Sequence, residues 1–124
     1  MVTNLTVGTH LIGTPWKPHL EGVIVIFEDV GEAPHRVDRI LTQWRNAGLL
    51  DNVAGVACSR FSWMGKNTLP GDLSMGEILE NRLGGLGVPL VVNLPTGHGL
   101  PNQALPLVQQ ARLDGRRGRL SLLP

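Results

Sequence analysis

The uninterrupted apolar run VIVIF at residues 23–27 constrains the fold of this chain more than any other feature of its sequence. Its side chains are β-branched or aromatic, and they do not alternate with polar ones. Such a run is typical of a strand that is covered on both faces, because a strand with one wet face alternates. We therefore predict that residues 23–27 form a central strand of a sheet.

Two main helices are predicted after this strand. Pro34 suits a first helical turn because it has no N–H and a fixed φ, and Gly48 can end that helix in a left-handed turn. Ser74 and Glu77 match a capping box, which satisfies free N–H groups at a helix start, and Gly84-Gly85 ends this second helix. Apolar residues of the first helix recur at helical spacing: Val37, Ile40, Leu41, Trp44 and Ala47.

Short apolar segments predict the remaining strands. We expect an edge strand or ordered arm at residues 5–12, a second buried strand at 53–61 and a third strand at 88–93. Residues 107–114 and 119–123 flank a turn and are typical of an antiparallel hairpin. Strands that alternate with helices and end in a hairpin predict an α/β fold, with a mixed sheet and helices packed on it. The 124 residues are enough for one ordinary domain, which we expect to span the whole chain.

Charge and cysteine content exclude several classes of function. The net charge of +1 and the charged fraction of 17% provide no basic surface for nucleic acid or a membrane. No apolar run approaches the roughly 18–20 residues of a membrane-spanning helix, and residues 1–4 lack the regions of a signal peptide. Cys58 is the single cysteine, so it forms no internal disulfide. We therefore expect a soluble cytoplasmic protein.

Two polar features lie just past the ends of predicted strands. Glu28-Asp29 directly follows residues 23–27, and Gly97-His98-Gly99 follows residues 88–93. In open α/β sheets, ligands and catalytic groups collect at the carboxyl ends of the strands. A partly desolvated Glu28 needs a partner, and the two glycines leave the imidazole of His98 unshielded. A carboxylate and an accessible histidine are the orienting and base members of a hydrolytic triad.

The same carboxylates also have plainer interpretations. Glu28 could form a structural ion pair with Arg36 or Arg39. Asp29 or Glu32 could instead cap the helix that follows. The residue types and their spacing leave these alternatives open.

Cys58-Ser59, at the end of the second buried strand, could offer a nucleophile. A lone cysteine is more typical of a buried, small apolar residue, and the nucleophile pattern GxSxG is absent. Neither the four histidines nor Cys58 have the spacing of metal ligands, so we expect no metal site.

Four blocks of the sequence resemble a known family. They are NLTV at 4–7, GTPWKPHLEG at 13–22, the block at 23–56 that contains EDVGEAP, and GHGLPNQALPL at 97–107. In this order they resemble the C-terminal domain of the LD-carboxypeptidases, a serine peptidase family that also contains the microcin-immunity proteins. The resemblance covers nearly the whole chain.

This resemblance implies a swivelling β/β/α domain that works together with an N-terminal domain. In the family, the N-terminal domain carries the serine nucleophile, and the C-terminal domain supplies a glutamate and a histidine. By motif these residues are Glu28, which begins EDV, and His98 of GHG. The resemblance implies no metal and no organic cofactor.

Four further residues are expected to support the site. Asp29 is expected to shape the turn before the first helix. Arg39 is expected to pair with Glu32 or Asp29 and to hold that turn in place. Gly97 lets the backbone approach another chain or a ligand closely. Trp63 is expected to wall the substrate cleft when the other domain is present.

No serine of this chain matches the nucleophile motif of the family, so we expect the serine in an N-terminal domain of the same protein. The chain is then either an excised domain or a truncated gene product, and alone it should be inactive. For the whole protein, the resemblance implies hydrolysis of the bond between a dibasic L-centre and D-alanine in muropeptides, or of a peptide-nucleotide antibiotic.

Two other classes of function stay open. Swivelling β/β/α domains can present a phosphohistidine in a glycine-rich loop, and Gly97-His98-Gly99 fits such a carrier, although a carrier leaves Glu28 unexplained. The apolar end LSLLP would suit a non-catalytic interaction module or a homodimer.

Overall fold

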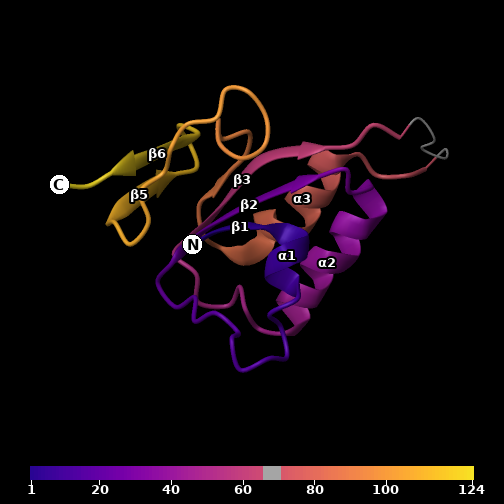
Figure 1. The fold of residues 1–124 in the computed structure, drawn as a ribbon, viewed down its shortest axis with the longest axis horizontal. Coiled ribbons are helices and arrows are strands. Elements are labelled where there is room, and N and C mark those ends of the chain that lie inside the picture. The colour runs from indigo at the N-terminus through magenta and orange to yellow at the C-terminus, as the bar shows by residue number, and fades with distance from the viewer. Residues whose placement is uncertain (66–70) are drawn as a thin grey trace.

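The computed structural model describes residues 1–65 and 71–124 (Figure 1). Four parallel strands form the main sheet, in the spatial order β1 (Val2–Asn4), β2 (Ile24–Val30), β3 (Gly55–Ser62) and β4 (Leu90–Val91). A second, antiparallel sheet consists of β5 (Ala111–Asp114) and β6 (Arg119–Leu122). The predicted central strand at residues 23–27 is confirmed, because β2 lies between β1 and β3.

Helices cover one face of the main sheet, and the β5–β6 hairpin lies on its other side (Figure 1). The helices are α1 (Leu5–Thr9), α2 (Pro34–Asn46) and α3 (Met75–Leu83), and a 3₁₀ turn, η1 (Gly84–Leu86), follows α3. In the described part of the chain, none of them has the length and hydropathy needed to cross a membrane. The α/β class, the two main helices and the C-terminal hairpin are confirmed.

The side chains of β2 enter two apolar clusters, one on each face of the sheet. Val25 and Phe27 are fully buried on the helical face, together with side chains of all three α-helices. Ile26 is buried on the opposite face, in a cluster that includes Leu113 of β5. Both faces of β2 are therefore covered at residues 25–27, which explains why the sequence does not alternate there.

Trp44 joins α2 to α1 and to the sheet. Its fully buried ring packs edge-on against Phe27, with the two ring centroids 4.9 Å apart. Its Nε1 donates a hydrogen bond to Oγ1 of Thr9 at 2.7 Å. A Cβ atom at Gly8 would lie 3.2 Å from Cζ2 of Trp44, so this glycine lets α1 approach the indole closely. The five-residue helix α1 is thus held by tertiary contacts, since a helix of this length is not stable alone.

The predicted capping box at the start of α3 is confirmed. Oγ of Ser74 accepts a hydrogen bond from the backbone N–H of Glu77, and Oε2 of Glu77 accepts one from the backbone N–H of Ser74. The helix ends at Leu83, directly before the predicted stop at Gly84.

The prediction of a strand at residues 5–12 is wrong. An edge strand is present, but it is β1 at Val2–Asn4, and the chain turns into α1 at Leu5. Asn4 caps α1, because its Oδ1 accepts a hydrogen bond from N of Val7 at 3.0 Å. Oδ2 of Asp29 accepts a second hydrogen bond, from N of Thr6, at 2.9 Å. The helix start depends on a residue far away in the sequence, which the local apolar pattern does not reveal.

The parallel and antiparallel strands lie in two sheets rather than in one mixed sheet. The hairpin packs onto the main sheet through Leu113 instead of extending its ladder. The third predicted strand, at 88–93, is shorter in the structure, where β4 spans only Leu90–Val91. On its C-terminal side, Asn93 has a φ of +61° and so leaves the extended conformation. The polar loop predicted after β3 lies partly outside the described residues.

Candidate active site

An irregularity in the pairing of β2 with β3 marks the end of the sheet where the polar residues lie. Phe27 pairs with Cys58, but Asp29 pairs with Phe61, so β3 has one residue more than β2 over this interval. Bulges of this kind re-aim side chains and are common beside functional sites. The two carboxylates that follow Phe27 are both buried, with exposed fractions of 6% for Glu28 and 4% for Asp29.

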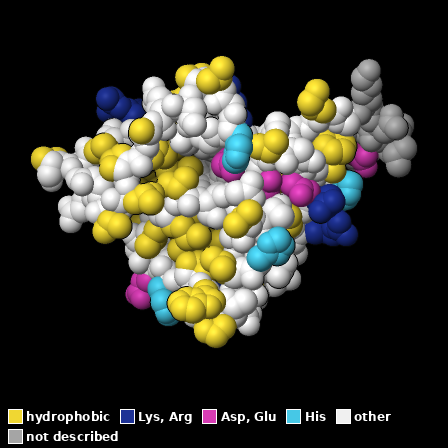
Figure 2. Space-filling model, viewed as in Figure 1, with side chains coloured by type: hydrophobic (Ala, Val, Ile, Leu, Met, Phe, Trp, Pro, Cys, Tyr) yellow, Lys and Arg dark blue, Asp and Glu magenta, His cyan; other side chains and the backbone are white. Residues whose placement is uncertain are grey.

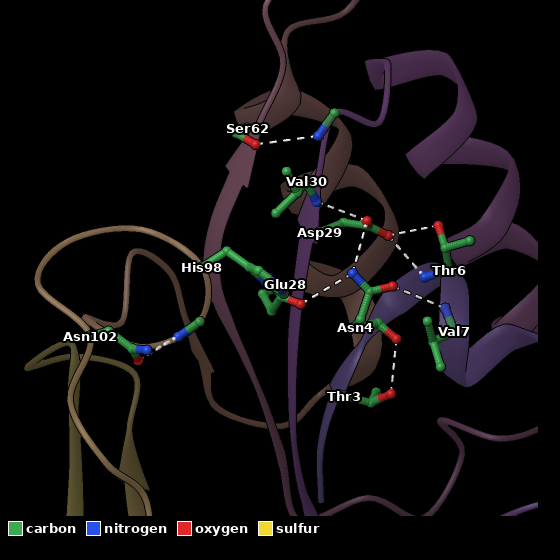
Figure 3. Close-up of polar contacts among 12 residues, drawn as sticks. Thr3, Asn4, Thr6, Val7, Glu28, Asp29, Val30, Ser62, His98 and Asn102 are labelled. Atoms are coloured by element: carbon green, nitrogen blue, oxygen red, sulfur yellow. Dashed lines mark hydrogen bonds and ion pairs between the residues drawn. The ribbon is translucent and has the colours of Figure 1, made fainter.

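The structure brings Glu28 and His98 together. Oε2 of Glu28 lies 2.7 Å from Nδ1 of His98, across 70 positions of sequence (Figure 3). Gly97 makes this approach possible. Its φ is +96°, and a Cβ atom there would lie 3.2 Å from Cγ of Glu28. A larger residue at this position would push the loop away from the carboxylate.

Glu28 controls the protonation of His98. The hydrogen bond to Glu28, and then the negative charge of Glu28, raise the pKa of His98 above its ordinary value of 6.5, and Asp29 adds a smaller contribution of the same sign. Because the carboxylate accepts at Nδ1, the neutral imidazole carries its proton there and leaves Nε2 free to accept one. The His98 side chain is 69% exposed. In the space-filling view, a histidine lies at the surface directly against acidic side chains (Figure 2).

The loop that carries His98 is held from two sides. The backbone N–H of Gly97 donates to Oδ1 of Asn102 at 3.1 Å (Figure 3). Nη1 of Arg60, from β3, donates to the carbonyl oxygen of Leu100. A Cβ atom at Gly99 would lie 3.1 Å from Cδ of Arg60, so this side chain lies against the loop backbone.

Asn4 joins the two buried carboxylates. Its Nδ2 donates to Oε1 of Glu28 at 3.1 Å and to Oδ1 of Asp29 at 3.0 Å (Figure 3). Oδ2 of Asp29 in turn accepts from Oγ1 of Thr6 at 2.7 Å, in addition to the backbone N–H of the same residue. Asp29 therefore supports the site through the start of α1. The alternative that Asp29 caps α2 is wrong, because Ala33 occupies that cap position without a side-chain hydrogen bond. Oδ1 of Asp29 accepts from N of Val30 at 2.8 Å, and its role in shaping the turn before α2 stays a prediction.

The ion pairs proposed as plainer interpretations are also corrected. Glu28 bonds to His98 instead of to an arginine. Glu32 pairs with Arg36, with 2.8 Å between Oε2 and Nε. Within the described residues Arg39 pairs with neither Glu32 nor Asp29, and its side chain is exposed on α2.

A groove of about 730 Å³ lies beside the Glu28–His98 pair. Trp63 does not line it. This side chain is 42% exposed and borders a separate cavity of about 300 Å³ with His35 and Asp38. The groove is lined by β1 and by the loop after β4, including Val2, Thr3, Asn4, Thr96, Gly97, His98, Leu105 and Leu107.

Neither of the other candidate groups forms a site here. Cys58 is fully buried, and burial raises the pKa of its thiol to about 12, so it is not a nucleophile at neutral pH. Ser59 is also buried, with 3% of its surface exposed. Among the described residues, no three His, Cys, Asp or Glu side chains are grouped as they would be to hold a metal ion.

Sequence reasoning missed three residues that support the pair. Asn4 lies in the NLTV block and Asn102 in the GHGLPN block, but no role was inferred for either. Asparagine is a preferred N-cap residue, and Asn4 directly precedes the segment that begins at Leu5. This position could have identified it as a helix cap. Arg60 carried no such signal, because its contact with Leu100 spans 40 positions.

The family described as the LD-carboxypeptidase C-terminal domain matches residues 1–113 of the chain. The fold and this match define the chain as a domain of the peptidase class. It belongs to the LD-carboxypeptidase family and corresponds to its C-terminal domain.

Relatives are longer than this chain. A Synechocystis protein named as a carboxypeptidase is 49% identical over 120 residues, which make up 97% of this chain and 40% of that protein. The murein tetrapeptide carboxypeptidase of Pseudomonas aeruginosa is 31% identical over 94% of this chain and 38% of its own length. The chain thus spans about two fifths of the length of these two relatives.

Solved structures agree with this assignment. The muramoyltetrapeptide carboxypeptidase from Oxalobacter formigenes superposes with a TM-score of 0.84 and 31% identity, over 98% of this chain and 42% of that one. The microcin C7 self immunity protein MccF superposes with a TM-score of 0.78, over all of this chain and 37% of its own. At 23% identity, the second likeness concerns the fold alone.

Replacing Gly97 with alanine is expected to destabilise the folded chain by about 1–3 kcal/mol, because it combines a left-handed φ with a contact to Glu28. Urea denaturation, monitored by circular dichroism, measures the change in the free energy of unfolding. Gly76→Ala is the matched control. Apart from its chain neighbours and the backbone of α3 itself, no described atom lies within 4 Å of a Cβ at this position, so the stability of this variant should stay the same or rise by up to about 1 kcal/mol. Equal effects of the two substitutions would contradict the close approach at Gly97.

The raised pKa of His98 predicts how stability depends on pH. The folded-state pKa lies above 6.5, so the protonated imidazole stabilises the folded chain below that value, and this contribution is lost as the pH rises through the folded pKa. His98→Gln should therefore lower the denaturation midpoint at about pH 5.5 and change it less at about pH 9. A loss of the same size at both pH values would argue against the pairing.

Proposed function

We propose that this chain supplies Glu28 and His98 to a Ser–Glu–His triad, whose serine belongs to an N-terminal domain of the same protein. The observation that carries the proposal is the 2.7 Å contact between Oε2 of Glu28 and Nδ1 of an exposed His98. The whole protein is then a serine carboxypeptidase. This function accounts for a buried carboxylate that has a histidine as its partner rather than an arginine.

Each group has a distinct role in the reaction. Nε2 of His98 takes the proton of the serine hydroxyl as the oxygen attacks the scissile carbonyl, and returns it to the leaving amine. Glu28 holds the imidazole in the required tautomer and stabilises the imidazolium that forms. Water then gives a proton to Nε2 as its oxygen attacks the acyl carbonyl, and Nε2 returns this proton to the serine oxygen as the acyl–serine bond breaks, which releases the acid product and restores the enzyme.

The isolated chain is inactive under this proposal, because the serine is missing. The exposed imidazole and the groove beside it suit a site that a second domain completes. The N-terminal domain of the same protein is therefore the partner that completes the site. The single buried cysteine is in keeping with a reducing compartment, and we place the protein in the cytoplasm.

The proposed substrate is a murein peptide. The relatives named for murein or muramoyl tetrapeptides are 31% identical to this chain, whereas the microcin-immunity structure is 23% identical. We therefore favour release of D-alanine from the dibasic L-centre of a muropeptide over cleavage of a peptide-nucleotide antibiotic. The direct Glu28–His98 contact also favours a triad over a phosphohistidine carrier, which needs no carboxylate at Nδ1.

A chimera tests this proposal. The chain replaces the matching C-terminal part of the Synechocystis relative, to which it is 49% identical, and release of D-alanine from a murein tetrapeptide is measured. The chimera should hydrolyse the peptide, while the 124-residue chain alone and the His98→Ala chimera should not. A folded chimera without activity, or one that keeps its activity after His98→Ala, would refute the assignment.

A further inference from the structure

We propose that Asn4 is a positioning residue of this site: it holds the carboxylate of Glu28 against His98 by bridging it to the buried carboxylate of Asp29. The effect of Asn4 on catalysis rests on the proposed function, whereas its effect on the Glu28–His98 contact does not. Asn4 lines the groove, but its side chain bonds to Glu28, Asp29 and Val7 and not to the imidazole, so in the triad it acts through Glu28.

All hydrogen-bonding groups of the Asn4 side chain are used. Nδ2 donates one proton to Glu28 and the other to Asp29, and Oδ1 accepts from the backbone N–H of Val7. This arrangement fixes the orientation of the amide. A flipped side chain would place its oxygen between two carboxylates and its NH₂ group against an N–H donor.

The bridge from Asn4 offsets an unfavourable concentration of negative charge at the end of β2. Two carboxylates on consecutive residues are both buried there. Buried carboxylates repel each other and lose their hydration, so they need hydrogen-bond donors to offset both costs. Asp29 accepts three further hydrogen bonds, from N and Oγ1 of Thr6 and from the backbone N of Val30. Asp29 is therefore the more firmly held of the two carboxylates, and Asn4 links Glu28 to it.

Both carboxylate oxygens of Glu28 therefore have a polar partner. Oε1 accepts from Asn4 at 3.1 Å, and Oε2 lies 2.7 Å from Nδ1 of His98. Without the amide, none of the described residues donates to Oε1, and the carboxylate is repelled by Asp29. It is then free to rotate away from the imidazole, so the contact with His98 is made for a smaller part of the time.

Asn4→Ser separates positioning from capping. Serine is also a good helix cap and can still accept from N of Val7, but it is too short to bridge the carboxylates and has no NH₂ group. In the 124-residue chain, NMR titration should show the pKa of His98 falling toward 6.5 in this variant. Asn46→Ser, the same change at the exposed C-terminal end of α2, should leave it unchanged. A native spectrum with an unaltered His98 titration in Asn4→Ser overturns the proposal.

A measurement on the unmodified chain decides the matter if Asn4→Ser does not fold. The side-chain NH₂ resonances of Asn4 should shift with the same midpoint as the His98 ring, because Glu28 links the two groups directly. Resonances that stay constant through the His98 titration overturn the proposal.

Activity supplies a separate readout. In the chimera, Asn4→Ser should lower kcat by about 10²-fold with KM unchanged, as expected when a catalytic group is misplaced rather than removed. An unchanged kcat overturns the positioning role. If the unmodified chimera is inactive, the proposed function fails, while the NMR titration still tests Asn4.

Discussion

Replacing Glu28 with glutamine in the active chimera should lower kcat by about 10⁴-fold, the size of loss expected when the orienting carboxylate of a triad becomes an amide. Glutamine has nearly the same shape, so the packing against Gly97 is kept. It carries no charge to stabilise the imidazolium, and its NH₂ group does not accept the proton at Nδ1 of His98. The rate of D-alanine release measures the change.

Glu21→Gln is the control for this experiment, because it makes the same chemical change in an exposed turn. It should leave kcat within about 2-fold of the unmodified chimera, as expected for surface substitutions. A Glu28→Gln chimera with kcat within about tenfold of the parent would be incompatible with a triad role. Intact phosphotransfer to His98 in that variant would point to a carrier instead.

Trp44→Ala should lower the free energy of unfolding by about 3–5 kcal/mol, the range for removing a large buried aromatic side chain. The indole is fully buried, packs edge-on against Phe27 and donates to Thr9. Its loss leaves a cavity between α2 and the sheet and removes the contact that holds α1. For a domain with an overall stability of about 5–15 kcal/mol, this is a large fraction of the total.

The matched control is Trp16→Ala, since the Trp16 side chain is 79% exposed. This substitution should change the free energy of unfolding by no more than about 0.5 kcal/mol. Urea denaturation of both variants gives the comparison. If Trp44→Ala cost less than about 1 kcal/mol, the described packing of α1 and α2 on β2 would be contradicted.

The elements that could be predicted from sequence are those whose signals are local. The continuous apolar run at 23–27 indicated a strand covered on both faces, and β2 has this environment. Pro34 and the helical spacing of Val37, Leu41 and Trp44 indicated α2. The capping pattern of Ser74 and Glu77 is made by two side chains that are three positions apart, so it also needs no distant partner.

The element that could not be predicted, α1, depends on distant contacts. Its five residues are too few to form a helix alone, and they are held by Asp29 at the first turn and by Trp44 along the side. The apolar character of residues 5–12 therefore suggested a strand. The same distance in sequence concealed the bridge from Asn4 to Glu28 and Asp29.

The pairing of Glu28 with His98 was predicted only in part by the residues themselves. Their places after two strands indicated the same edge of a sheet, but local patterns also allowed an arginine partner for Glu28. The resemblance to the LD-carboxypeptidases selected the histidine. The structure adds the atoms in contact and the close approach at Gly97, neither of which follows from motif spacing.

Glu28 contacts Nδ1 of His98, and this contact leaves Nε2 free to take a proton. The most direct test is ¹⁵N NMR of the four imidazole rings of the chain above the His98 pKa, with the His98 signals assigned by comparison with His98→Gln. We predict that neutral His98 carries its proton on Nδ1, and that this preference is lost in Glu28→Gln. A neutral His98 with its proton on Nε2, unchanged by Glu28→Gln, would show that Glu28 does not hold the imidazole through Nδ1.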